Sequence, residues 1–163
     1  MEIRLARKED LFQINEIYNQ AVRQLFCTAH LEPVTMSERE LWFSSHSPDR
    51  FPIFVAQKEN SLAGWVSLGS YRENRQALAH VAEVSYYVEE GERGKGVGSV
   101  LLDYAMKAAP KFGFSVLVAI LLNKNPASIA LLEKFGFEAW GVLPGIARIG
   151  NQEADHLYYG LKL

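Results

Sequence analysis

Apolar and polar residues recur with two different periods along the chain, and these periods predict its elements. Near the start, Ile3 and Leu5 alternate with polar neighbours, which is typical of a short strand. From Glu9 the period becomes helical, with apolar residues at Leu11, Ile14, Ile17, Tyr18, Ala21, Val22 and Leu25. A second, short helix is predicted from Ser37, where Ser37-Glu38-Arg39-Glu40 resembles a capping box, to a stop before Pro48.

The rest of the chain alternates between strand and helix patterns. Strands are predicted at residues 51–57, 62–68, 81–88, 115–122, 137–142 and 156–161. Helices are predicted after the glycine-rich residues 91–98 and over residues 125–135, where Gly136 ends the pattern. The resulting order, β-α-α-β-β-β-α-β-α-β-β, predicts one α/β domain over residues 1–163, with a mixed central sheet of about seven strands flanked by about four helices.

Composition and charge narrow the classes of function. The chain has 17 Lys and Arg against 19 Asp and Glu, a net charge of −2 that disfavours nucleic acid as a partner. Its one cysteine, Cys27, excludes an internal disulfide and suits a reducing compartment. No apolar run approaches the roughly 20 residues that cross a bilayer, and the start lacks a secretory signal. We therefore expect a cytoplasmic protein with no membrane contact.

The glycine-rich segment between a predicted strand and a predicted helix carries the most specific chemical signal. Residues 88–99 read VEEGERGKGVGS. Glycines let the backbone approach a ligand closely, and the N–H groups at a helix start favour phosphate. Arg93 and Lys95 add positive charge. The P-loop pattern fails here because its Lys and Ser/Thr are missing, and the dinucleotide fingerprint fails because its last glycine interval is too short.

The hexapeptide Arg93-Gly94-Lys95-Gly96-Val97-Gly98 instead resembles the acyl-CoA pyrophosphate loop of the GNAT superfamily of N-acyltransferases. A later Asn125-Pro126-Ala127-Ser128 followed by Gly136-Phe137 is also typical of that superfamily. The resemblance runs along essentially the whole chain. Within the superfamily, Glu32-Pro33-Val34-Thr35 and Ala82-Glu83-Val84 resemble the phosphinothricin acetyltransferase-like group.

This resemblance implies a GNAT-like fold and acetyl-CoA as co-substrate. No metal is expected, because the spacing of three puts His80 and Glu83 on opposite faces of a strand and no third ligand is evident. The residues implied at the CoA pyrophosphate are Arg93, Gly94, Gly96, Gly98 and Ser99, with Lys95 contributing charge. The backbone of Tyr87 and Val88 is expected to pair with the pantetheine arm. The next helix is expected to contact the same arm through Asn125 and Ser128.

Glu83 is the candidate general base, because it stands in an otherwise apolar strand and matches a strand glutamate of the resembling group. A thioester is attacked only by a free-base amine, so a base is useful near neutral pH. The alternative is an ordinary outward-facing glutamate. The Val88 N–H is the oxyanion candidate. Leu132 stands where many members of the superfamily carry a tyrosine that acts as general acid. The candidates for the general acid are therefore Tyr86, Tyr87 and solvent.

The acceptor implied by the resemblance is a small amino acid or analogue, of the phosphinothricin or methionine sulfone/sulfoximine type. Arg75 matches an arginine of that group, and a guanidinium can hold a carboxylate through two hydrogen bonds. Arg72 is an equally reachable cation. Glu32 and Asp155 are further substrate-binding candidates.

Two other functions stay open at this point. The chain could be a non-catalytic acyl-CoA-binding or sensing module, which needs the glycine loop but not Glu83. It could also acetylate proteins or peptides. A homodimer is expected because the resembling group is dimeric.

Overall fold

The computed structural model describes all residues, 1–163, and its elements follow the predicted order. The strands are β1 (Glu2–Leu5), β2 (Ile53–Lys58), β3 (Ser61–Ser70), β4 (Val81–Val88), β5 (Val116–Leu122), β6 (Glu138–Ile149) and β7 (Gln152–Lys162). The helices are α1 (Leu11–Arg23), α2 (Met36–Ser45), α3 (Val97–Ala108) and α4 (Pro126–Lys134). The expected mixed sheet of seven strands with four helices is confirmed.

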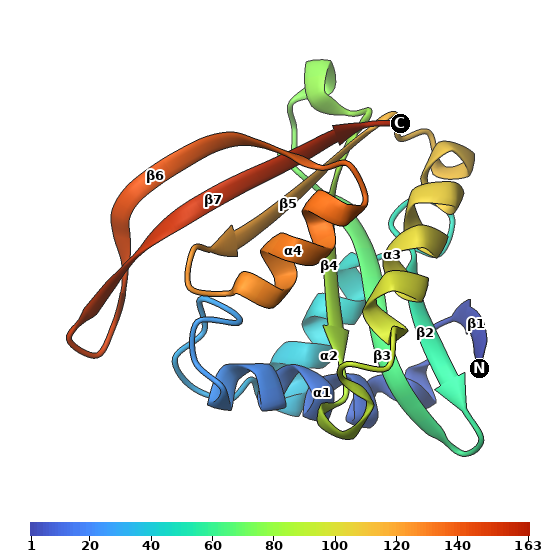
Figure 1. Cartoon of the computed structure of the whole chain (residues 1–163). Helices are drawn as coiled ribbons and strands as arrows, with labels where there is room; N and C mark the ends of the chain where they lie inside the picture. The colour runs from blue at the N-terminus through green and yellow to red at the C-terminus, as the bar shows by residue number, and fades with distance from the viewer.

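The strands form one sheet in the order β1-β2-β3-β4-β5-β7-β6, in which only β4 and β5 run parallel. These two strands pair over only three residues each, Val81–Glu83 with Val116–Val118. Beyond that point they diverge, and the opening between them lies at the centre of the molecule (Figure 1). The divergence leaves backbone groups of both strands available to a ligand.

The helices cover both faces of the sheet, and alternation along β4 assigns its side chains to the two faces. Ala82 and Val84 belong to the larger core, which α3 completes with Leu101 and Leu102. On the other face, Tyr87 packs against a smaller cluster that includes residues of α1 and of β3. A residue of β4 therefore contacts either the core or the space beneath α1 and α2, depending on its position in the strand.

The N-cap of helix α2 lies two residues earlier than its sequence pattern suggested. Its N-cap is Thr35, whose side chain accepts a hydrogen bond from the Glu38 N–H at 3.3 Å, while Glu38 accepts one from the Thr35 N–H at 2.8 Å. The capping box is thus Thr35–Glu38, and the expected box at Ser37–Glu40 is wrong. Both segments have the Ser/Thr-x-x-Glu spacing, so spacing alone does not separate them.

The β6–β7 hairpin is the other departure from the expected boundaries. It extends to Ile149 instead of 142 and projects from the rest of the sheet (Figure 1). The register shifts between Ala139 and Gly141 and again between Leu143 and Ala147, and the second irregularity accommodates Pro144-Gly145 within the paired strands. None of the helices is long and apolar enough to span a bilayer.

Candidate active site

The glycine loop turns directly into α3 and leaves its first amides free. Gly94 and Gly96 have φ of +74° and +85°, in the left-handed region that glycine adopts without strain. Gly96 is the N-cap, and the first hydrogen bond into the helix runs from the Val100 N–H to the Gly96 carbonyl at 3.1 Å. The N–H groups of residues 97–99 have no partner within the helix, so they form an anion-binding end.

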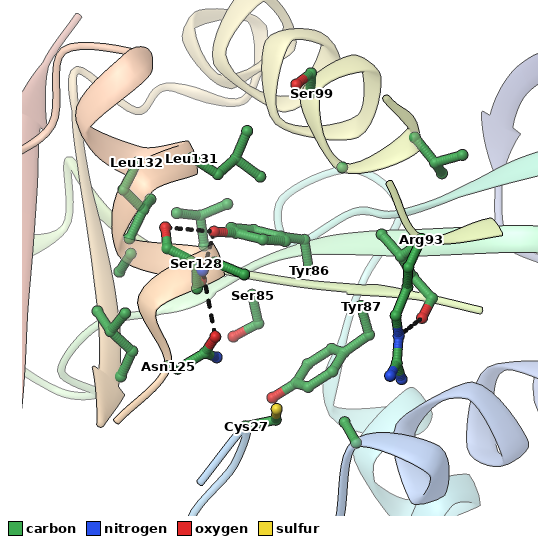
Figure 2. Close-up of a pocket in the computed structure, with 18 of the residues that line it drawn as sticks. Cys27, Ser85, Tyr86, Tyr87, Arg93, Ser99, Asn125, Ser128, Leu131 and Leu132 are labelled. Carbon is green, nitrogen blue, oxygen red and sulfur yellow. Dashed lines mark hydrogen bonds between the residues drawn. The ribbon is translucent and has the colours of Figure 1, made fainter. Parts of the chain in front are cut away.

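The two basic residues of the loop have different positions. Arg93 donates through Nε to the Val88 carbonyl at 3.2 Å, which ties the loop to β4 (Figure 2). It also donates through Nη1 to Gln24, the C-cap residue of α1. Lys95 is exposed and pairs at 3.3 Å with Glu92, which itself borders the space beside the loop, whereas Lys95 does not. Arg93 therefore borders the anion-binding end, whereas the expected contribution of Lys95 to it is reduced by its acidic partner.

A cavity of about 500 Å³ fills the opening between the diverging strands. The predicted cofactor-binding residues that line it are Tyr87, Val88, Arg93, Gly94, Gly96, Gly98, Ser99, Asn125 and Ser128. The cavity thus runs from the loop and the start of α3, past β4, to the start of α4 (Figure 2). The structure brings together every one of the predicted cofactor-binding residues except Lys95.

The hydrogen bonds of β4 decide which of its backbone groups face this cavity. The Glu89 N–H donates to a carbonyl of β3 at 2.9 Å. Since bonded and non-bonded pairs alternate along antiparallel strands, Tyr87 is bonded to β3, whereas Val88 and Tyr86 turn their N–H groups away from it. The Val88 N–H is therefore free to pair with a ligand, as expected. The Tyr87 N–H is not free, and the second free N–H belongs to Tyr86.

The α4 side of the cavity is held by side-chain hydrogen bonds. Asn125 caps α4 by accepting from the Ser128 N–H at 3.2 Å, and the Tyr86 hydroxyl lies 2.6 Å from the Ser128 Oγ (Figure 2). Burial raises the pKa of Tyr86 to about 12, so its phenol keeps its proton at neutral pH. Leu132 is buried beside this cavity and has no proton to donate.

A second cavity, of about 470 Å³, lies on the α1 and α2 side of the sheet. It shares five lining residues with the first, namely Cys27, Ser85, Tyr87, Ile120 and Leu121. Glu83 lines this second cavity from β4. Its side chain is half-buried, and desolvation raises the pKa of its carboxyl above the ordinary value. The anion-binding end and the half-buried carboxyl thus lie in adjoining cavities.

The four predicted substrate-binding residues do not line either cavity. Arg72, Arg75 and Glu32 are exposed, and the Arg75 guanidinium bonds only the carbonyl of its neighbour Asn74. Asp155 accepts hydrogen bonds from Asn123 at 3.0 Å and from a backbone N–H of β6. In the single chain their side chains thus lie in solvent or hold the strand ends, and their role in substrate binding stays a prediction.

The second cavity is lined instead by residues that the sequence did not single out, Tyr18, His30, Arg39 and Trp42 among them. The Tyr18 hydroxyl bonds Thr28 at 2.7 Å, and also His30, which fixes the segment after α1 over the cavity. The sequence held one signal that could have indicated this wall: Arg39 precedes Trp42 by three residues, so both lie on the same face of their helix.

The sheet opens between two parallel strands, with an anion-binding helix start at one end and a half-buried carboxyl at the other, an arrangement suited to an enzyme that binds a phosphate-bearing co-substrate. The sequence matches the acetyltransferase (GNAT) family over residues 19–137. The chain belongs to this family, as the glycine loop predicted.

Three relatives illustrate the similarity. YwnH of Bacillus subtilis, named "Putative phosphinothricin acetyltransferase", is 42% identical over 164 residues, covering 100% of this chain and 99% of its own. The L-methionine sulfoximine/L-methionine sulfone acetyltransferase of Pseudomonas aeruginosa is 33% identical over 162 residues, covering 99% and 94%. The solved structure of Salmonella typhimurium yncA "with its cofactor Acetyl-CoA" superposes with a TM-score of 0.93 at 29% identity, covering 100% and 94%.

These similarities bear on the predictions unequally. Family, fold and enzyme class are confirmed. The predicted co-substrate, acetyl-CoA, agrees with the group bound in the Salmonella relative. The roles of individual residues stay predictions, and they rest on the geometry described above.

Proposed function

We propose that residues 1–163 act as one acyl-CoA-dependent domain that transfers an acetyl group from acetyl-CoA to the amine of a small amino acid or analogue. Methionine sulfone, methionine sulfoximine and phosphinothricin are the candidate acceptors, because relatives at 33% and 42% identity carry those names. The observation that carries the proposal is the junction of the two cavities at Ser85 and Tyr87, which connects an anion-binding end to a buried carboxyl.

The residues of the first cavity fit acetyl-CoA. The free amides of residues 97–99 and the turn at Gly94 and Gly96 receive the pyrophosphate, with Arg93 beside them. The opening between β4 and β5 receives the pantetheine arm, which has an amide carbonyl to pair with the free N–H of Tyr86 and leaves the Val88 N–H for the thioester carbonyl. When bound, acetyl-CoA supplies an acyl group activated as a thioester.

Glu83 serves as the general base in this proposal. An α-amino group has a pKa of roughly 7.7–8.0, so most of it is protonated at neutral pH and has no lone pair for attack. Glu83 removes that proton, directly or through one water, as the nitrogen bonds the carbonyl carbon. Burial favours this role because it raises the carboxyl pKa toward the working pH.

The remaining charge changes fall on groups of β4. The Val88 N–H donates to the carbonyl oxygen as negative charge develops there, since it points away from β3 into the cavity. The departing thiolate needs a proton. Tyr86 and Tyr87 both retain theirs, because burial raises the pKa of each phenol, so both stay candidates alongside solvent.

Release of free thiol tests the proposed function. The purified chain is given acetyl-CoA with methionine sulfone, phosphinothricin, a polyamine or a peptide with a free N-terminus. We expect release with the amino-acid analogues and little with the polyamine or peptide. A preference for the peptide would make the chain a protein acetyltransferase, and acetyl-CoA binding without any thiol release would make it a binding module.

We also propose a homodimer assembled through β6. This strand is at the edge of the sheet and exposes four large apolar side chains, Trp140, Val142, Leu143 and Ile146. An exposed edge strand with an apolar patch is a surface that another chain can cover. We place the enzyme in the cytoplasm, since its single free cysteine, Cys27, suits a reducing compartment.

A further inference from the structure

Arg39 is a buried cation in the wall of the second cavity. It lies on α2 and is 4% exposed. Its guanidinium carbon lies 4.5 Å from the centre of the Tyr18 ring and 4.6 Å from that of Trp42. These aromatic faces attract the cation and hold its plane in place. Burial nevertheless disfavours the charge, and it lowers the pKa of Arg39. A charge in such a place ordinarily has an anion beside it.

The chain itself does not provide that anion. Arg39 takes part in none of the five ion pairs, and its hydrogen bond runs from Nε to the Asn15 Oδ1 at 3.0 Å. Nη1 and Nη2 have no partner in the chain. Because no buried side-chain nitrogen or oxygen lacks a partner, both Nη atoms must reach solvent, and the cavity is the space that Arg39 lines. The outer edge of the guanidinium thus offers its donors to the cavity.

We propose that Arg39 binds the carboxylate of the amino-acid acceptor while the amine points toward Glu83. This deepens the proposed function and rests on it. A guanidinium fixed through Nε and packed between aromatic rings presents two parallel donors, the geometry that a carboxylate matches. The other ionisable groups that line the cavity besides tyrosines and Cys27 are Glu38, His30 and His156, and Arg39 is the most buried cation among them.

The same arrangement assigns a selectivity. An acceptor with both an amine and a carboxylate satisfies Glu83 and Arg39 together, whereas a simple amine leaves the buried guanidinium unpaired. The free-energy cost of leaving a buried charged donor without a partner exceeds the free energy that a satisfied hydrogen bond contributes. Arg39 therefore takes the role of carboxylate clamp that the sequence had suggested for Arg75.

The test compares methionine sulfone with its carboxamide, in which an uncharged NH2 group replaces one oxygen of the carboxylate. In the parent enzyme we expect KM for the carboxamide to be higher. Replacing Arg39 by Met should raise KM for methionine sulfone roughly 10- to 100-fold, the loss expected for a charge-assisted hydrogen bond. KM for the carboxamide should change little, and Arg39→Lys should fall between. Arg23→Met, which removes an exposed arginine at the end of α1, is the matched control.

Two readouts separate a clamp from a structural role. Acetyl-CoA affinity by calorimetry should be unchanged in Arg39→Met. The variant should stay folded at the assay temperature, although its melting temperature falls because the buried Asn15 Oδ1 loses its donor. Equal KM increases for both acceptors, or none for either, would overturn the proposal. If the parent acetylates neither acceptor, the proposed function fails; calorimetric binding of methionine sulfone, present in the parent and lost in Arg39→Met, then still tests the clamp, and its absence from the parent overturns it.

Discussion

A carboxyl group that is removed from water and has no cation beside it releases its proton at higher pH than an ordinary glutamate. Glu83 is in this position, with desolvation as the cause. If it is the base, kcat/KM must fall as pH drops through the raised pKa, because the protonated carboxyl accepts nothing. We expect an acidic limb centred above 4.5, the ordinary glutamate value. Glu83→Gln should remove that limb and lower kcat roughly 10²- to 10⁴-fold.

Two controls accompany the Glu83 measurement. Glu16→Gln removes the same charge from an exposed position on α1 and should leave the pH profile unchanged. Because a raised carboxyl pKa means that ionisation disfavours the fold, the contribution of Glu83 to stability is lost as pH rises through its pKa. Glu83→Gln should therefore melt no lower than the parent at pH 7. A full-rate Glu83→Gln enzyme would remove the residue from the mechanism.

The left-handed backbone at Gly96 allows a second test at the residue scale. Gly96→Asp places a carboxylate at the anion-binding start of α3 and should weaken acetyl-CoA binding by about two orders of magnitude or more, measured by calorimetry. Gly150→Asp is the control, because Gly150 also has positive φ, +59°, and open space around it, but lies in the β6–β7 turn. Similar losses in the two variants would show that strain, not charge, is responsible.

At the scale of elements, α2 carries Arg39 and Trp42 into the second cavity, and its N-cap holds the start of the helix. Thr35→Ala removes the side-chain acceptor of the Glu38 N–H. Losing such a cap costs about 1 kcal/mol, which should lower the melting temperature by about 2–4 °C. Ser37→Ala is the matched control. A larger decrease in melting temperature for Ser37→Ala than for Thr35→Ala would support the capping box at Ser37–Glu40 that the spacing first indicated.

The order of the elements was predictable because local periods determine it, and the bounds of β4 were predicted correctly at 81–88. The length of β6 was not, because Pro144-Gly145 breaks the strand pattern, and only pairing with β7 carries the strand past it. In the candidate site, the sequence predicted the residues that belong to one contiguous motif, such as those of the glycine loop. Arg39 was missed because the second cavity joins distant segments of the chain, and no local sequence pattern records which arginine faces it.

At the scale of the whole molecule, the apolar side chains of β6 are the surface on which assembly is predicted. Val142 and Ile146 are 52% and 61% exposed. The parent should scatter light as a dimer at micromolar concentration, and Ile146→Glu should give a monomer, because it sets like charges against each other across a two-fold interface. Phe12→Glu, on an equally exposed phenylalanine of α1, should leave the dimer intact. A monomeric parent would refute the assembly.

The divergence of β4 and β5 leaves an unfinished sheet in the interior of the free enzyme, and its exchange with heavy water should record this. The amides of Tyr86 and Val88 face the opening, whereas that of Tyr87 is bonded to β3. In the free protein the first two should exchange quickly, and Tyr87 slowly. On adding acetyl-CoA, Tyr86 and Val88 should become protected and Tyr87 should change little. The co-substrate then behaves as a temporary strand, and the enzyme completes its own sheet only while it holds one.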